Sequence, residues 1–349
     1  MNLCAKAGIS AAVYSLRTEG ASGIGDFGDI AALIDLAGAL GVGKVVLQSV
    51  VDVTFDGWGS GKGFASGVTF DSDGVPQAPI YPVYINTRPL NKILNKAKAA
   101  TLAASAAELD TLAEIDYRKV YNVKMHLLRE RFWQEGEDVL GSEAYHTFWK
   151  ANRDWLESYS VYCSLRHNYG TGNSRYMAET DYESLMEDAH FINEYSDDIR
   201  LHLYVQFLLH SQLEEAFRYA AKKGITLSVS TETPRNVFFA QWWSDLAPQD
   251  RQEYYSQTLG LTGEAPAAPE PWIAEAFIRN KLNNSASEAV MPLEDWLAST
   301  SILPRIPAGS YGDSRPENWH YRMDVPISSI ISHSALLECL RRMVADSAK

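Results

Sequence analysis

Two acidic residues, Asp52 and Glu232, occupy positions along the chain that could support chemistry. Each follows a run of mostly apolar residues that predicts a buried strand, Lys44 to Val51 and Ile225 to Ser230. Barrel enzymes place catalytic groups at the carboxyl ends of such strands, where carboxyl groups serve as nucleophiles or as general acids and bases. Acidic residues are also common in ordinary loops, so both are weak catalytic candidates.

Two further motifs resemble ligand sites but are better explained as turns. Gly23-x-Gly25-x-x-Gly28 lacks the acidic ribose partner of a dinucleotide fingerprint, because Gln48-Ser49-Val50 ends the second strand. Asp71-Ser72-Asp73-Gly74 has part of a calcium-loop pattern but lacks its third ligand and distal Glu. The sequence therefore predicts no cofactor and no metal.

The composition indicates a globular protein, since 46% of the 349 residues are hydrophobic. A formal charge of −13 without a Lys/Arg block argues against nucleic acid as a partner. No apolar run approaches the roughly 20 residues that a bilayer requires, and Met1 to Leu16 does not have the pattern of a signal peptide. We expect a soluble cytoplasmic protein in which Cys4, Cys163 and Cys339 are free thiols.

The elements that must position these residues alternate between strands and helices. Ala7 to Leu16 predicts a buried strand, the apolar face of Ile30 to Leu40 predicts a helix, and Lys44 to Val51 predicts a second strand. This βαβ pattern favours a parallel sheet covered by helices. Leu90 to about Arg200 is helical by period, and Leu201 to Lys223 predicts a long helix before the strand Ile225 to Ser230.

The stretch Gly23-Ile24-Gly25-Asp26-Phe27-Gly28-Asp29, followed by an amphipathic helix and Lys44-Val45-Val46-Leu47-Gln48, is specific. It resembles the first β/α unit of the 4-α-glucanotransferases, which are also called amylomaltases or disproportionating enzymes. The helical stretch resembles the helical insertion of that family. Pro271-Trp272-Ile273, Leu293 to Leu297 and Asn318 to Met323 resemble its closing β/α units and loop.

The resemblance implies an α/β fold, a partial (β/α) barrel related to the TIM barrel, with parallel strands and a large helical insertion. The corresponding division is 1–89 for the first β/α units, 90–200 for the insertion, and 201–349 for the remaining units and a C-terminal helix. Strands one, two, a hybrid of three and seven, and eight of the parent barrel would form a contiguous parallel sheet. We expect its two open edges to be closed by a homodimer or covered by the insertion.

The catalytic middle of the family is missing from this chain. The family carries a nucleophile in Arg-Ile-Asp, an acid in Gly-Glu-Asp and a third carboxylate in Thr-His-Asp, whereas this chain runs from Ser230 almost directly to Trp242-Trp243. Thr233-Pro234-Arg235 occupies the positions of the third motif. Gly136-Glu137-Asp138 spells the acid motif, but it stands on an insertion helix and predicts a solvated helix face.

Aromatic residues provide a possible sugar site. The resemblance implies substrate contacts for Trp242, Trp243, Trp296, Asn318 and Trp319, since flat apolar rings suit sugar stacking. The alternative is that these tryptophans pack in the core and between helices.

Three functions therefore stay open at this point. The first is a non-catalytic homologue that binds a maltooligosaccharide or another α-1,4-glucan, or modulates a glucan-metabolising partner. The second is an active, remodelled 4-α-glucanotransferase that uses Glu232 or Asp52. The third is an assembly or interaction protein without a sugar site.

Overall fold

A four-stranded parallel sheet lies at the centre of the computed structural model, which describes residues 3–48, 50–52, 68–90, 92–169, 182–230, 238–284, 288–300 and 320–347. The strands are β1 (Cys4–Ala11), β2 (Val42–Leu47), β5 (Thr226–Val229) and β6 (Ala289–Pro292). Their order is β5-β2-β1-β6, and every neighbouring pair is parallel. This is the order predicted for a barrel that has lost its central strands.

The first βαβ unit forms as predicted, with shifted strand ends. Helix α1 (Ile30–Leu40) has the predicted bounds and ends at Gly41, whose φ of 79° is the left-handed conformation that glycine favours at this position. β1 ends at Ala11, before the predicted end of the strand, because the backbone then turns through Val13–Ser15. The Oγ of Ser15 donates to the carbonyl of Ala12 at 2.9 Å and supports that turn.

The glycine-rich stretch after β1 is a tight turn, as predicted. Asp26 Oδ1 accepts from the N–H of Gly28 at 3.0 Å, and Asp29 Oδ2 accepts from the N–H of Asp26 at 2.7 Å. The two carboxylates therefore cap the start of the following helical segment reciprocally. A Cβ on Gly25 would lie 2.0 Å from the carbonyl oxygen of Val13, so no larger residue fits this turn.

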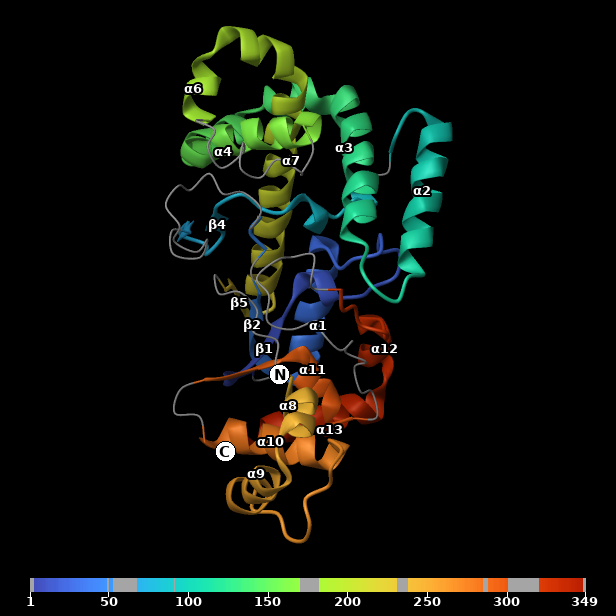
Figure 1. Ribbon diagram of the computed structural model, residues 1–349. Coiled ribbons are helices and arrows are strands. Elements are labelled where there is room, and N and C mark those ends of the chain that lie inside the picture. Colours follow the sequence, from blue (N-terminus) through green and yellow to red (C-terminus); the bar gives the residue numbers. More distant parts are fainter. Residues whose placement is uncertain are drawn as a thin grey trace.

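The predicted helical insertion is a group of helices at one end of the molecule (Figure 1). They are α2 (Lys96–Asp110), α3 (Tyr117–Leu140), α4 (Glu143–Tyr169) and α6 (Tyr182–Glu187). Helix α7 (Ala189–Lys222) begins among them and runs to the sheet, where β5 follows it. It begins 12 residues before the predicted Leu201, with Asp188 as its N-cap. The division into three domains stays a prediction.

A second group of helices lies at the other end of the molecule (Figure 1). It comprises α8 (Phe239–Asp245), α9 (Pro248–Glu253), the π-helical turn Tyr254–Thr258, α10 (Pro271–Asn284), α11 (Leu293–Ala298), α12 (Ile327–Ser332) and α13 (Ser334–Ser347). Helices α12 and α13 both pack against α1. The segment between β2 and the insertion adds a small hairpin, β3 (Thr69–Phe70) and β4 (Pro76–Gln77).

Several local predictions are confirmed on the surface. Asp71 Oδ1 accepts from the N–H groups of Asp73 and Val75, both at 2.9 Å, which makes this stretch a hairpin turn. Glu137 and Asp138 are exposed on α3, and Glu137 pairs with Arg200 at 2.6 Å. The three cysteines are free thiols. In the described parts of the chain, no helix combines the length and the apolar character needed to cross a bilayer.

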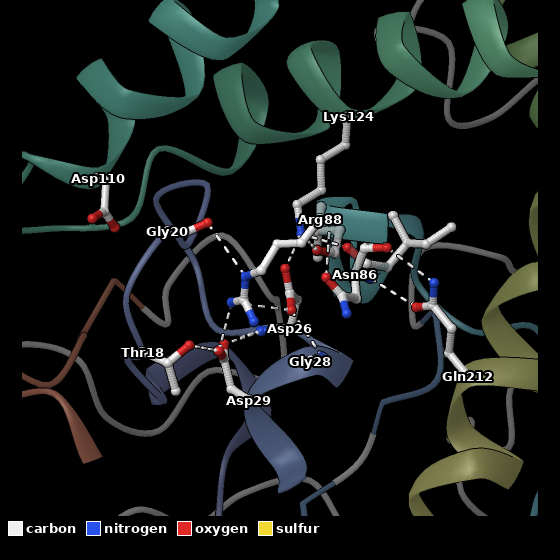
Figure 2. Close-up of polar contacts among 12 residues, drawn as sticks. Thr18, Gly20, Asp26, Gly28, Asp29, Asn86, Arg88, Asp110, Lys124 and Gln212 are labelled. Carbon is white, nitrogen blue, oxygen red and sulfur yellow. Dashed lines mark hydrogen bonds and ion pairs between the residues drawn. The ribbon is translucent and has the colours of Figure 1, made fainter. Parts of the chain in front are cut away.

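A group of four charges, three of them buried, joins the insertion to the turn after β1 (Figure 2). Lys124 of α3 is 1% exposed, and its Nζ donates to Asp26 Oδ2 at 3.1 Å and to the carbonyls of Val83 and Ile85 at 2.7 and 2.8 Å. These three acceptors match the three N–H groups of an ammonium ion. The geometry therefore suits a charged ammonium, while burial lowers the pKa of Lys124 on balance and Asp26 opposes that fall.

Arg88 completes this charge group from the other side. Its guanidinium donates to Asp29 Oδ1 at 2.6 Å and to the carbonyl of Gly20 at 3.3 Å (Figure 2). Burial and the neighbouring Asp26 raise the pKa of Asp29, and Arg88 opposes that rise. Thr18 also donates to Asp29. Because both carboxylates are hydrogen-bonded on all sides, we interpret this group as structural rather than catalytic.

Replacing Lys124 with Met should therefore destabilise the protein strongly. The variant removes the ammonium that is hydrogen-bonded to the buried Asp26 carboxylate and leaves only Arg88, at 3.6 Å, as its ion-pair partner, so we expect the free energy of unfolding in urea to fall by about 3–5 kcal/mol. The matched control is Lys98→Met, because Lys98 pairs with Glu130 at 2.6 Å but its side chain is 57% exposed. The control should lose about 1 kcal/mol or less. Similar small losses in both variants would contradict a central role for the buried pair.

Candidate functional site at the carboxyl ends of the strands

Polar side chains follow three of the four strands at the edge of the sheet where ligand sites form in parallel folds. Ser15 lies in the turn after β1, Asp52 follows β2, and Glu294 and Asp295 follow β6. All four are buried, with between 1% and 5% of their surface exposed. The structure therefore brings acidic groups to this edge, but encloses them.

Asp52 is held by the helical insertion. Its Oδ2 accepts from the Oη of Tyr159 on α4 at 2.8 Å, and its N–H donates to the carbonyl of Pro79 at 2.9 Å. Burial, together with the Asp52 carboxylate, raises the pKa of Tyr159 well above its usual value. Asp52 thus connects the end of β2 to α4 in this conformation, and its predicted catalytic role stays a prediction.

Arg166 supplies positive charge near Asp52. Burial by itself would lower the pKa of this guanidinium. Asp52 and the neighbouring tyrosines outweigh that effect, so the pKa lies above its usual value. The guanidinium carbon lies 5.7 Å from the ring centre of Tyr121, which stacks in turn on Tyr81. These contacts bind the carboxyl end of β2 to α3 and α4 with charge and aromatic packing.

Glu294 and Asp295 are the titratable groups at this edge that sequence reasoning missed. Burial raises the pKa of each carboxyl to about 7. Glu294 Oε1 lies 3.5 Å from the Oγ of Ser15, and Asp295 Oδ1 accepts from the N–H of Phe239 at 2.7 Å. A signal was available, because both acids lie within Leu293 to Leu297, the stretch that resembles a closing β/α unit of the family.

The strand order argues against a catalytic pair made of Asp52 and Glu294. β1 lies between β2 and β6, so the ends of these two strands are about 9–10 Å apart at the usual spacing. Retaining glycosidases hold their two carboxyl groups about 5–5.5 Å apart. In the described part of the chain, no cluster of His, Cys, Asp and Glu is arranged to hold a metal ion.

The structure places the predicted sugar-binding tryptophans in two different packing regions. Trp243 is fully buried between α8 and the π-helical turn, where it contacts Phe239 and Tyr255, and its Nε1 donates to the carbonyl of Pro266 at 3.0 Å. Trp296 is fully buried in the core around the sheet. Trp242 is partly buried and meets the ring of Tyr254 edge-on at 4.8 Å.

None of these contacts tests a sugar-binding role, which stays a prediction for all three tryptophans. Glu232, Asn318 and Trp319 lie outside the described residues.

A model of the family described as 4-alpha-glucanotransferase matches residues 11–234, which is more than half of the chain. The chain belongs to the 4-α-glucanotransferase family. The family predicted from the glycine-rich turn and the insertion is thus confirmed, and the match ends within the stretch where the catalytic strands of the family are missing.

Two curated relatives show how much of a family member this chain represents. A 4-alpha-glucanotransferase of Oryza sativa subsp. japonica is 26% identical over 225 residues, which are 63% of this chain and 23% of that protein. A 4-alpha-glucanotransferase of Chlamydia muridarum is 21% identical over 248 residues, which are 68% of this chain and 44% of that protein. The chain thus spans less than half the length of these 4-α-glucanotransferases, which fits a shortened member.

The fold class is confirmed by a solved structure. The amylomaltase from Streptococcus agalactiae in complex with acarbose is similar with a TM-score of 0.66 and 11% identity. The match covers 98% of this chain and 99% of that one. At this identity the likeness concerns the fold, which is an α/β arrangement of parallel strands and many helices related to the amylomaltase barrel.

Stability should depend on pH through Glu294 and Asp295. Both carboxyls have a folded pKa near 7, above the ordinary values of 4.5 and 3.8, so the folded chain binds their protons more tightly. Their stabilising contribution is complete below the ordinary values and is lost as the pH rises through about 7. We expect the free energy of unfolding to fall between about pH 4 and pH 7 for this reason and to change little from these groups at higher pH.

Glu294→Gln tests this dependence, because the amide keeps the shape and cannot ionise. The variant should show a smaller loss across the same pH range and should exceed the parent in stability at about pH 8, as measured by urea denaturation. Glu270→Gln, at an exposed position before α10, is the control and should keep the parent's slope. An unchanged slope in Glu294→Gln would show that the carboxyl is already ionised in the folded protein.

Proposed function

We propose that this chain is a degenerate, non-catalytic 4-α-glucanotransferase homologue that binds an α-1,4-glucan or modulates a glucan-metabolising partner. The observation that carries the proposal is the short connection after β5. Only residues 230–238 separate β5 from α8, whereas a single crossover between parallel strands needs a dozen residues or more. This leaves no room between those elements for the strands that carry the nucleophile, the acid and the third carboxylate of the family.

The cost of such a loss to catalysis is large. Removing one member of a catalytic set commonly lowers kcat by several orders of magnitude, and removing the whole set leaves little beyond binding. The enclosed state of Asp52 and Glu294 supports the same conclusion, because neither carboxyl reaches the surface. The three free thiols are typical of a reducing compartment, which supports a cytoplasmic location.

Purified protein should bind maltoheptaose in a calorimeter but release no glucose from maltotriose. The expected lack of glucose follows from the missing carboxylates. The Glu232→Gln variant tests whether any glucose release depends on this carboxyl group. If the parent releases glucose and Glu232→Gln does not, the chain is an active, remodelled transferase and the proposal is wrong.

Trp319→Ala should weaken maltoheptaose binding by about tenfold if this ring stacks on a sugar. Trp133→Ala is the control, because Trp133 lies on α3 with 64% of its surface exposed and is not one of the predicted sugar contacts. Equal affinities in both variants would remove Trp319 from the site. Flat calorimetry in the parent would favour an assembly protein without a sugar site.

We also propose that the protein forms a homodimer through an open sheet edge. Among the described residues, β5 is the outermost strand and pairs with β2 on one side. Thr226→Lys together with Ser228→Lys should shift the protein towards monomer in light scattering, since charged side chains block edge pairing. Thr147→Lys, at an exposed position on α4, should leave the oligomeric state unchanged. A parent that is monomeric at high concentration would contradict the proposal.

A further inference from the structure

A cavity of about 320 Å³ lies between α3, α4 and α7 in the helical insertion, with Tyr121 on its lining. Its polar lining comes from Asn122, His126 and Arg129 of α3, His167 of α4 and His202 of α7. The three α3 residues follow the spacing i, i+4 and i+7, which places them on one face of the helix. Sequence analysis assigned no role to any of these residues.

Hydrogen-bond donors outnumber acceptors around this cavity. Arg129 Nη2 lies 3.1 Å from Asp198 Oδ1 and 3.4 Å from His167 Nε2. Both contacts use the same nitrogen, and the N–H groups of Nε and Nη1 take part in neither. The imidazoles and the Asn122 amide add further donors, while Asp198 supplies the carboxylate of the group.

His202 forms the buried part of the lining. It is 2% exposed, and its Nδ1 has no hydrogen-bond partner among the described residues. Buried polar atoms are nearly always paired, so a buried unpaired one often marks a site for a water, an ion or a ligand. Burial is the main reason that the pKa of His202 falls to about 3, and His167, Arg129 and Arg166 lower it further against the opposing Asp198. Positive groups therefore outnumber the single carboxylate beside this ring.

We propose that this cavity binds a phosphate group, either as inorganic phosphate or as part of a phosphate monoester. A phosphate dianion presents several strong acceptor oxygens, which suits donors that arrive from three helices. Arg129 supplies the planar guanidinium that phosphate prefers. The local excess of donors stands out on a chain whose formal net charge is −13. This proposal does not depend on glucan binding or on transferase activity.

The experiment is a titration of the full-length protein at neutral pH and constant ionic strength. Inorganic phosphate and glucose 6-phosphate are the two anionic probes, maltose is the neutral probe, and histidine ring NMR signals with calorimetry are the readouts. We expect saturable phosphate binding below about 10 mM, with shifts in the signals of His167 and His202. Tighter binding of glucose 6-phosphate than of inorganic phosphate would identify a phosphate monoester as the preferred ligand.

Arg129→Ala should weaken the binding of the anionic probe by at least about tenfold. Arg279→Ala is the matched control, because its side chain is 36% exposed against 34% for Arg129 and it pairs with Glu275 and Asp346 far from the cavity. His167→Gln is a second test at an exposed position where folding is not at risk, and it should also weaken binding.

Three results would overturn the proposal. The first is no binding of either anionic probe up to about 10 mM. The second is equal binding in Arg129→Ala and Arg279→Ala, which would show that the anion associates with the surface in general. The third is maltose binding that depends on Arg129 in the absence of phosphate binding, which would make the cavity a sugar site.

Discussion

The buried ion pair between Lys124 and Asp26 is the interaction on which the arrangement of this molecule depends. It joins α3 of the insertion to the glycine-rich turn that starts α1, across 98 residues of sequence. A buried cation is tolerated only when every hydrogen bond is satisfied, and Lys124 achieves this with one carboxylate and two carbonyls. The pair therefore fixes where the insertion sits relative to the sheet, although it adds little net stability over a well-packed apolar pair.

The same attachment explains why the carboxyl ends of the strands are closed. Once α3 is fixed, α4 packs beside it and brings Tyr159 to Asp52. The carboxylate that sequence reasoning placed at the mouth of a site is thus used to hold two parts of the protein together. On the far side of β1, Glu294 and Asp295 are enclosed by the turn after β1 and by α8. The carboxyl groups at this edge are therefore enclosed by neighbouring elements of the structure.

A sheet of four described strands has open edges, which a closed barrel does not have. In a closed barrel every strand has two neighbours, whereas β5 has one described neighbour here. The largest part of the chain outside the sheet is helical. The cavity between α3, α4 and α7 is lined by His and Arg side chains.

The sequence by itself determined the local elements and, through its family resemblance, the strand order. Glycines, helical period and short apolar runs act over a few residues, so α1 was predicted to the residue and β5 to within one residue at each end. Only the tertiary structure decided that Asp52 meets Tyr159, that Glu294 has a raised pKa, and that Trp243 is enclosed. Burial and pKa depend on contacts between residues far apart in the chain, which no local pattern contains.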